Sequence, residues 1–469
     1  MSFPRYPKYK ESVTPVFEIL PAGWSVTRLK RVVDSARPIT YGIVQAGENV
    51  VDGVPYVRPA DMSDEMGLKS YESLLRTSNE IAYSYRRSAI SSGDIVCSIG
   101  PSFGKVMITP SELEGGNLTQ GTARVSISVE NSNRYYFWVL RSLESFQQWE
   151  SSVGGATFRA LNLGPLAETT CPRPPLTEQS QIARFLDHET ANIDALIHEQ
   201  ERLIELLKEK RQAVISHAVT KGLDPDVPMK DSGVEWLGEV PVHWDLMPAK
   251  FLLEFVTSGS RGWAEYYSDT GYLFFRIANL TRDSIRPKLE SIQCVSPPES
   301  SEGARAKIKV GDILVSITAD LGSVCAADQS VEGGYVSQHV ALARPDNNLC
   351  HPDWLAYFIL GDAAKEQLLG SGYGGTKVQL SLEDIRELVV AVPPLVDQES
   401  IAKVLAERLT GMEALISEAN QAVNFLAERR SALISAAVTG KIDVRNWRPP
   451  ADESAYDEEV RQTGMEATV

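Results

Sequence analysis

Two stretches of the sequence interleave arginine, asparagine and aromatic side chains with loop-forming residues. One extends from Ala36 to Met62 and the other from Ser258 to Leu280. Arginine and asparagine make paired hydrogen bonds to the edges of guanine and adenine, so both stretches predict loops that contact DNA. The alternative for the second stretch is that Trp263 belongs to a core and Arg276 to an ordinary surface. The candidate contact residues are Arg37, Thr40, Tyr41, Gln45, Tyr56 and Arg58 in the first stretch, and Arg261, Trp263, Tyr266, Tyr267, Arg276 and Asn279 in the second.

Two shorter glycine-rich segments have the composition of phosphate-contacting loops. Thr157 and Arg159 follow a glycine pair, and Gly375, Thr376 and Lys377 occur in a similar order in the second half of the chain. Backbone amides next to glycine, together with one cation, can bind a phosphate group. We therefore expect these residues to contact the backbone of the same DNA.

The sequence shows no arrangement of residues that is typical of catalysis or of metal binding. Its six histidines form no HExxH or HxH pattern. The run GPSFGK, from Gly100 to Lys105, is one residue too short for a phosphate-binding loop, and no serine or threonine follows its lysine. A GxSxG elbow is absent, and so is a tetrapeptide like the Asn-Pro-Pro-Tyr that amino-methyltransferases use at the flipped base. We therefore predict a binding protein with no catalytic residue, metal or cofactor of its own.

The charge of the chain opposes simple binding to nucleic acid. The net charge is −16, and the segment from Ala451 to Val469 holds six acidic residues and one arginine, which is typical of a disordered tail. Because the remainder is also acidic, contact with DNA must depend on local basic residues or on a basic partner. Five cysteines without CxxC spacing, and no apolar run long enough to span a membrane, indicate a cytoplasmic protein.

The sequence repeats itself at a constant offset of 219 residues. KRQAVISHAVT, which ends at Thr220, returns as RRSALISAAVT, which ends at Thr439. Pro174-Pro175-Leu176 returns as Pro393-Pro394-Leu395. Short periods indicate solenoids, whereas a period near half of the chain indicates a duplicated pair of domains.

Each copy contains the pattern of a long helix. From Thr177 to Lys221 the apolar residues follow steps of four and three, and the second copy keeps the same phase. Such spacing, sustained over about six heptads between charged flanks, predicts a coiled coil. One helix cannot bury an apolar stripe alone, so we expect the two helices to pair, and a whole connecting domain leaves them free to lie antiparallel. The predicted seam and partner-docking residues are Ile182, Leu186, Ile193, Leu196, Leu203 and Leu207 in the first helix, and Ile401, Leu405, Met412, Leu415, Leu426 and Leu433 in the second.

Charged residues interrupt the predicted seam. In an antiparallel pair aligned end to end, Glu189 faces Arg429, which would help to set the register. The same alignment brings Lys210 near Arg408, which is unfavourable. The alternative is that these positions are solvated and specify nothing.

The segments outside the helices also resemble each other, but more weakly. SSGDIVCSIG, which ends at Gly100, aligns with KVGDILVSIT, which ends at Thr318, and Gln120 corresponds to Gln338. Their β-branched runs between glycines predict domains rich in strands. We therefore expect an α+β fold with an internal pseudo-two-fold, in which two α/β domains alternate with two long helices that pair as an antiparallel coiled coil.

These repeated elements resemble the specificity (S) subunits of type I restriction-modification systems over nearly the whole chain. The most specific element is VTKGLDPDVPMKDSGVEWLGEVPVHW, from Val219 to Trp244, with a degenerate earlier copy from Tyr6 to Trp24. PPLTEQSQIARFLD and PPLVDQESIAKVL are similar to the repeated starts of the family's conserved helical regions. The first copy departs from the pattern, because VTPVFEILPAGW replaces a run like GVEWLGEVPVHW.

The resemblance implies two target recognition domains, each reading one half of a split double-stranded DNA sequence. It also implies spacer helices that dock two modification (methyltransferase) subunits, and an association with restriction or motor subunits. S-adenosylmethionine, ATP and Mg would then be bound by those partners and not by this chain. The expected boundaries are recognition domains at residues 1–173 and 225–392, spacer helices at 174–224 and 393–443, and an acidic tail at 444–469.

Two other functions are compatible with parts of the pattern. A divergent DNA methyltransferase would bind its cofactor as an isolated chain, which the missing motifs argue against. A purely structural coiled-coil scaffold would have no use for two large diverged domains, and a DNA shift in the presence of a partner would exclude it.

Overall fold

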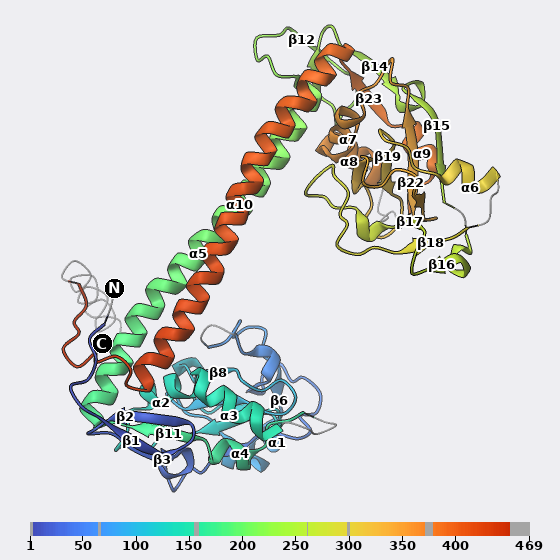
Figure 1. Cartoon of the computed structure of the whole chain (residues 1–469). Helices are drawn as coiled ribbons and strands as arrows, with labels where there is room; N and C mark the ends of the chain where they lie inside the picture. Colours follow the sequence, from blue (N-terminus) through green and yellow to red (C-terminus); the bar gives the residue numbers. More distant parts are fainter. Residues whose placement is uncertain are drawn as a thin grey trace. The chain divides into compact units, whose positions relative to one another are not determined.

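The computed structural model describes residues 3–63, 67–153, 159–259, 261–297, 301–370 and 379–450. The chain divides into two compact units, one of Met1–Gln200 with Gln421–Val469 and the other of Glu201–Asn420. Each unit holds one half of the long helix α5 (Leu176–Lys221) and one half of the long helix α10 (Leu395–Val438), which are labelled in Figure 1.

The first unit combines small sheets and short helices with its halves of the two long helices. Its strands are β1 (Tyr9–Thr14), β2 (Phe17–Pro21), β3 (Ser25–Arg28), β4 (Thr40–Tyr41), β5 (Val54–Val57), β6 (Arg76–Thr77), β7 (Ile95–Ser98), β8 (Val106–Ile108), β9 (Asn117–Leu118), β10 (Thr122–Val125) and β11 (Thr170–Arg173). Its short helices are α1 (Asn79–Ser84), α2 (Asn133–Leu140), α3 (Leu143–Val153) and α4 (Leu163–Ala167).

The second unit has a closely similar set of elements. Its strands are β12 (Met229–Asp231), β13 (Glu239–Pro241), β14 (Asp245–Pro248), β15 (Leu253–Ser258), β16 (Tyr267–Ser268), β17 (Tyr272–Phe275), β18 (Cys294–Val295), β19 (Ile313–Ser316), β20 (Val324–Ala326), β21 (Tyr335–Val336), β22 (Val340–Pro345) and β23 (Val389–Val392). Its short helices are α6 (Ser301–Ala306), α7 (Pro352–Leu360), α8 (Asp362–Leu369) and α9 (Leu382–Arg386).

A four-stranded antiparallel sheet has the same topology in both units. Its order is β4-β10-β7-β8 in the first unit and β15-β22-β19-β20 in the second. The register corresponds as well, because Ile95 pairs with Val125 in one sheet and Ile313 pairs with Ala343 in the other. The duplication and the mixed α+β fold predicted from the sequence are therefore confirmed.

The central strands of these sheets are buried on both faces, which explains their continuous apolar sequences. In β7, Ile95 and Cys97 belong to the core beside the long helices, whereas Val96 belongs to a second core on the opposite face. In β19, Ile313 and Leu314 divide between two cores in the same way. Alternate residues of one strand thus join the sheet to the helices and to the outer loops.

The halves of α5 and α10 within each unit pack against each other in opposite chain directions. In the first unit, Leu186 and Ile193 of α5 share a core with Ile434 of α10. In the second unit, Ile215 of α5 shares a core with Leu405 of α10. The antiparallel coiled coil predicted from the sequence is confirmed.

The seam differs from the prediction in the middle of the helices. Leu196 and Leu415 are each 51% exposed and Leu203 is 43% exposed, so their predicted place in the seam was wrong, whereas their predicted role in partner docking stays a prediction. Going from Ile193 to Leu196 places two steps of three in succession, whereas a helix of 3.6 residues per turn needs a step of four to Ile197. The other predicted seam residues are buried or half-buried. The observed seam follows Leu186, Thr190, Ile193, Ile197, Gln200, Ile204 and Leu207 in α5, and Leu405, Leu409, Met412, Ile416, Ala419, Val423 and Leu426 in α10, again 219 residues apart.

The polar contact between the helices also differs from the prediction. In the first unit, Arg430 pairs with Asp194 at 2.7 Å. Glu189 lies 3.8 Å from the neighbouring His188, and the described part of the chain shows no ion pair between Glu189 and Arg429. A shift of one residue along the helix therefore places a different arginine at the seam.

A buried glutamine fixes the start of each long helix. The amide of Gln179 accepts a hydrogen bond from the backbone of Ser132, next to α2, and donates one to Pro174. The amide of Gln398 accepts from the backbone of His351, next to α7, and donates to Leu349 and Pro393. Each amide therefore joins a long helix to the short helix packed beside it.

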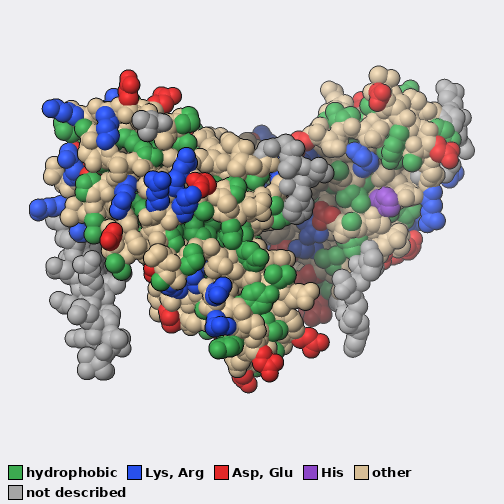
Figure 2. All heavy atoms as spheres, turned by 90° about the horizontal axis from the view of Figure 1, so that it is seen from below, with side chains coloured by type: hydrophobic (Ala, Val, Ile, Leu, Met, Phe, Trp, Pro, Cys, Tyr) green, Lys and Arg blue, Asp and Glu red, His purple; other side chains and the backbone are tan. Residues whose placement is uncertain are grey.

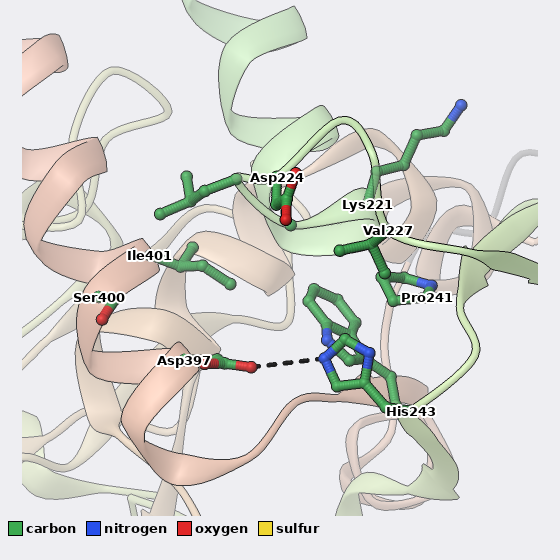
Figure 3. Close-up of a pocket in the computed structure, with 11 residues that line it drawn as sticks. Lys221, Asp224, Val227, Pro241, His243, Asp397, Ser400 and Ile401 are labelled. Atoms are coloured by element: carbon green, nitrogen blue, oxygen red, sulfur yellow. Dashed lines mark ion pairs between the residues drawn. The ribbon is translucent and has the colours of Figure 1, made fainter.

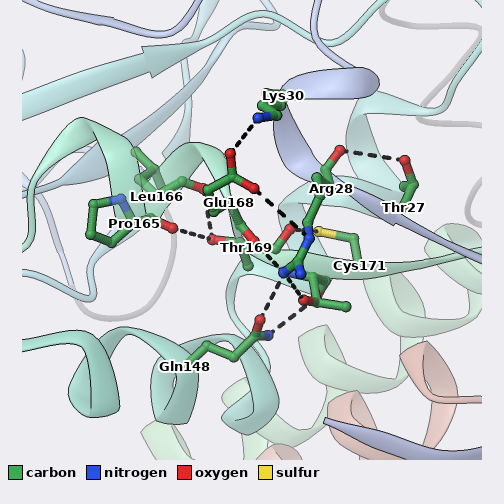
Figure 4. Close-up of polar contacts among 10 residues, drawn as sticks. Thr27, Arg28, Lys30, Gln148, Pro165, Leu166, Glu168, Thr169 and Cys171 are labelled. Atoms are coloured by element: carbon green, nitrogen blue, oxygen red, sulfur yellow. Dashed lines mark hydrogen bonds and ion pairs between the residues drawn. The ribbon is translucent and has the colours of Figure 1, made fainter. Parts of the chain in front are cut away.

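A second glutamine in each unit holds the strand that leads into the long helix. Gln148 exchanges two hydrogen bonds with the backbone of Thr170 in β11, at 2.8 and 3.1 Å, as Figure 4 shows. Gln367 makes the same pair with Val389 in β23, at 2.8 and 3.0 Å. In Figure 4, Glu168 also points toward Lys30, and the corresponding pair in the second unit is Glu387 with Lys250. These contacts recur because the same join is built twice.

The first prediction concerns Gln398, which is fully buried. Gln398→Leu removes partners from the backbone N–H of His351 and from two carbonyl groups, and each unsatisfied buried group costs about 1–3 kcal/mol. We expect the free energy of unfolding of the second unit to fall by roughly 3 kcal/mol in urea titrations. The control is Lys403→Gln at an exposed position of the same helix, which should shift the free energy of unfolding by less than about 0.5 kcal/mol. Equal stability of the two variants would contradict the role assigned to Gln398.

Candidate nucleic-acid interface

A close crossing of backbone segments brings each predicted contact stretch against a turn of the sheet. A Cβ on Gly42 would lie 2.0 Å from the carbonyl oxygen of Leu118, and a Cβ on Gly259 would lie 1.8 Å from that of Val336. Only glycine permits such an approach. In the first unit the backbone N–H of Gln120 donates to Ile43 at 2.9 Å across this crossing. The stretch and the turn therefore form one surface in each unit.

In the second unit this surface contains an open cavity of about 270 Å³. Aromatic and polar side chains share its wall. Gln338 Nε2 lies 2.9 Å from His339 Nε2, and His339 Nδ1 lies 3.1 Å from the Thr318 hydroxyl. The cavity is lined by Gly262, Trp263, Ala264, Tyr267, Phe274, Arg276, Ile277, Ala278, Ser337, Gln338 and His339.

Two polar atoms at this cavity have no partner among the described residues. These are the hydroxyl oxygen of Ser337, a residue only 5% exposed, and Nε of Arg276. A buried polar atom without a partner costs free energy unless a ligand or water satisfies it. Ser337 and His339 were not among the contact residues predicted from the sequence. The one sequence signal that pointed to this turn was the correspondence of Gln120 with Gln338 in the repeat.

The residues predicted in the second stretch divide between surface and core. Arg261 and Tyr267 are exposed, Tyr266 is half-buried, and Arg276 is half-buried with a hydrogen bond of 3.3 Å to Ser291. Of these four residues, Tyr267 and Arg276 line the cavity.

Two other predicted residues of this stretch are structural. Trp263 is 7% exposed and stacks on Phe274, with ring centroids 6.1 Å apart. Asn279 is fully buried, and its amide donates to the carbonyl groups of Lys288 and Ser291. Asn279 was predicted to contact DNA, and this is a correction, because its hydrogen-bonding groups already hold the loop together.

The arginines of the first stretch are held by buried carboxylates. Arg37 pairs with Asp94 at 2.7 Å and Arg58 pairs with Asp61 at 2.7 Å, and both aspartates are at most 6% exposed. Tyr56 is 5% exposed and belongs to the interior. The predicted contact residues left at the surface are Thr40, which is half-buried, and Tyr41 and Gln45, which are exposed.

The structure describes only part of the two glycine-rich segments. Thr157, Gly375, Thr376 and Lys377 lie outside the described residues. Arg159 is exposed and forms an ion pair with Glu150.

Charged side chains of both signs lie on the face that Figure 2 draws, where lysine and arginine are interspersed with aspartate and glutamate. No cluster of three metal-binding side chains occurs among the residues that the structure describes. Burial raises the pKa of Cys97, Cys171 and Cys350 to about 12, so these thiols remain protonated at neutral pH. No helix in the described ranges is both long and apolar enough to cross a membrane.

Comparisons with known proteins agree with this architecture. A family model described as the type I restriction modification DNA specificity domain matches residues 21–206 and 266–424. The chain is 27% identical over 202 residues to the type I restriction enzyme EcoBI specificity subunit of Escherichia coli. This match covers 43% of this chain and 42% of that protein. It is 23% identical over 450 residues to the putative type I restriction enzyme MjaX specificity subunit of Methanocaldococcus jannaschii. This second match covers 93% of this chain and 98% of that protein.

A solved structure shows the same fold. It belongs to work on complex assembly and conformational transition of the type I R-M system, and its chain matches with a TM-score of 0.63 at 19% identity. The match covers 90% of this chain and 99% of the other.

The second prediction separates structural from exposed arginines. Arg37→Ala leaves the buried carboxylate of Asp94 without its charged partner, which should lower the free energy of unfolding by roughly 2 kcal/mol. Arg261 is exposed and has no ion pair with a described residue, so Arg261→Ala should change the free energy of unfolding by less than about 0.5 kcal/mol. Urea denaturation of both full-length variants checks this. A loss of stability in the Arg261 variant would show that Arg261 is not a free surface residue.

Proposed function

The chain belongs to the type I restriction-modification DNA specificity family, and from this premise we propose that it is the subunit that selects the DNA sequence. In this proposal two recognition domains, at residues 1–173 and 225–392, each read one half of a split double-stranded target. The chain itself contributes no catalytic group. A divergent methyltransferase or a pure scaffold is not favoured, since the related proteins are specificity subunits.

The repeated crossing at Gly42 and Gly259 is the observation that carries the proposal. In both units it supports a loop and a turn of the same topology, while the side chains presented there differ. One scaffold with two different sets of exposed side chains is what reading two different half-sequences requires.

The second domain offers the chemistry for base recognition. Arg261 and Tyr267 are exposed, and Gln338 and His339 line the same cavity as Tyr267. A glutamine amide reads adenine through N6 and N7, and an arginine reads guanine through O6 and N7. Arg276 and Ser337 supply further unsatisfied hydrogen-bond donors at the same place.

The helices supply a surface for the partners that the family resemblance implies. Leu196 and Leu415 are equivalent in the repeat, and each is 51% exposed on the outer side of its helix. We place one modification subunit near each of these leucines, giving two modification subunits to one specificity subunit. Restriction or motor subunits join this complex in the cytoplasm, and S-adenosylmethionine, ATP and Mg are bound by the partners.

The third prediction tests the assignment of one domain to one half of the target. Phe17–Arg173 is exchanged for the matching segment of a relative, and the methylated sequence is then determined in cells that also contain the cognate modification subunit. Only one half of the methylated motif should change, because the pairing of β3 with β11 joins the two ends of this segment within the first unit. A change in both halves, or in neither, would refute the assignment.

The fourth prediction tests the docking surface. Leu196→Glu combined with Leu415→Glu should weaken the binding of purified modification subunit at least tenfold, since a buried leucine contributes about 1.5–3 kcal/mol. Both positions are exposed in the free chain, so the melting temperature should stay within about two degrees. The matched control changes the exposed Glu199 and Glu418 to Gln. Unchanged binding of the modification subunit by the leucine variant would place docking elsewhere on the helices.

A further inference from the structure

The segment that leads into β7 in the first unit and into β19 in the second carries an exposed arginine at the same place. Arg87 lies in the short 3-10 helix η3 (Arg86–Ser88), which follows α1, and Arg305 lies in the last turn of α6. The two arginines are 218 residues apart, which is also the offset between Gln120 and Gln338. Both are exposed, and neither makes a hydrogen bond or an ion pair with a described residue.

Backbone hydrogen bonds hold this segment in the same position in both units. The N–H of Ile90, three residues after Arg87, donates to the carbonyl group of Gly116 at 2.9 Å. The N–H of Ile308, three residues after the arginine of the second unit, donates to the carbonyl group of Gly334 at 2.8 Å. The two arginines therefore correspond in structure as well as in sequence.

The carbonyl group two residues after each arginine is also bound from the sheet. The carbonyl oxygen of Ala89 accepts from the guanidinium of Arg124 at 2.6 Å, and that of Lys307 accepts from the guanidinium of Arg344 at 3.4 Å. These guanidinium groups come from β10 and β22, which occupy equivalent places in the two sheets. The backbone that carries each exposed arginine is therefore anchored to the sheet, while the arginine side chain itself has no described partner.

In each unit this segment lies against the crossing that forms the candidate DNA surface. In the first unit the Ser88 hydroxyl donates to the side chain of Asn117 at 2.7 Å. Asn117 begins β9, and the next carbonyl oxygen of that strand lies against Gly42. In the second unit α6 packs against β21, in which the carbonyl oxygen of Val336 lies against Gly259.

In the second unit the segment also adjoins the cavity assigned to base recognition. Lys307 forms a backbone bridge with Tyr335, and the Tyr335 ring packs on that of Trp263 with centroids 5.2 Å apart. Trp263 lines the cavity. The segment of Arg305 is therefore next to the residues that we expect to read bases.

Both segments are basic although the whole chain is acidic. Residues 85–92 hold two arginines and no acid, and the equivalent residues 303–310 hold one arginine, two lysines and no acid. All five of these cations are exposed. The chain as a whole has 46 basic and 62 acidic side chains, so a local excess of positive charge is what contact with DNA requires of it.

A second cavity of the second unit, of about 240 Å³, has the opposite character. Figure 3 shows the Asp397 carboxylate and the His243 ring facing each other, and their atoms are 3.5 Å apart. The side chain of Lys221 extends away from this cavity, whereas Asp224 lies at its edge. A phosphate group would meet two carboxylates there, so this cavity does not suit DNA.

We propose that Arg87 and Arg305 each bind a phosphate group of the DNA, one in each half of the target. This inference rests on the proposed function, because it takes both domains to bind DNA. Contacts to bases must differ between domains that read different half-sequences, whereas phosphate groups are the same along every sequence. An exposed arginine kept in both domains therefore suits the phosphate backbone, while its neighbour is free to change, as Arg86 does to Ala304.

Repetition alone does not indicate contact with DNA. Lys30 and Lys250 are also equivalent in the repeat, but each pairs with a glutamate of its own unit, Glu168 in the first and Glu387 in the second. These lysines have a structural partner, whereas the two arginines have none among the described residues. The lysine pair is therefore a matched control for the arginine pair.

The experiment uses the purified complex of the full-length chain and its modification subunit, with two DNA duplexes of equal length. One duplex contains the motif that is methylated in cells, and the other has both half-sequences scrambled. Fluorescence anisotropy gives the dissociation constants over a series of salt concentrations. Arg87→Gln combined with Arg305→Gln should weaken binding to both duplexes by the same factor, roughly tenfold. The slope of the logarithm of affinity against the logarithm of salt concentration should fall by about 1.8, because each phosphate contact contributes about 0.9.

Two further variants show whether the effect belongs to these positions and to their charge. Lys30→Gln combined with Lys250→Gln removes the same charge and should leave the salt slope unchanged. Arg87→Lys combined with Arg305→Lys should keep the wild-type slope, because a phosphate contact needs only a cation. The methylated motif should be the same in all variants, and the melting temperature of the arginine variants should stay within about two degrees of the wild type.

An unchanged salt slope in the glutamine variant of the two arginines, or a fall equal to that of the lysine control, would overturn the proposal. A loss of affinity confined to the methylated motif would also overturn it, since the arginines would then be base contacts. A lower melting temperature would make them structural residues instead. The salt slope on the scrambled duplex tests this inference by itself, whereas a wild-type complex that bound both duplexes equally would contradict the proposed function.

Discussion

Burial of a single apolar stripe on each of two long helices is the constraint on which the rest of the structure depends. One helix cannot bury such a stripe alone, and within each unit residues of α5 and α10 share one core. The seam repeats every three and four residues at positions 219 apart, and Ile193 and Met412 occupy equivalent places in it. Because the two stripes are equivalent, each unit packs its own halves of the two helices in an antiparallel pair.

The joins between helices and domains are fixed by polar contacts rather than by apolar packing. Gln179 and Gln398 fix the helix starts, while Gln148 and Gln367 fix the strands that precede them. An apolar contact tolerates small rotations, but a buried amide loses its hydrogen bonds when either partner moves. This difference explains why these glutamines recur while most of the surrounding residues have changed.

The sequence predicted the duplication, the paired helices and the absence of catalytic motifs, because each depends on spacing along the chain. Prediction from the sequence failed where the spacing of residues does not determine which side chains meet. The seam prediction included Leu196 because leucine is apolar, although its phase on the helix turns it outward. Arg37 and Asn279 have the residue types of base contacts, yet Arg37 is held by the distant Asp94 and Asn279 by the carbonyl groups of Lys288 and Ser291 in its own loop. His339 was missed because one histidine in a turn has no pattern of its own.

The two domains show how one scaffold can present different surfaces. Asp94 and Asp312 occupy equivalent buried positions and need a positive partner. In the first domain Arg37 comes from the predicted contact stretch, and Ser126 completes the hydrogen bonding. In the second domain Arg344, at the position equivalent to Ser126, binds the carboxylate from within the sheet. Neutralising the second carboxylate inside the sheet leaves the arginines of the second stretch available, and Arg261 stands exposed there. The interior charge balance therefore decides which residues each domain can offer to a ligand.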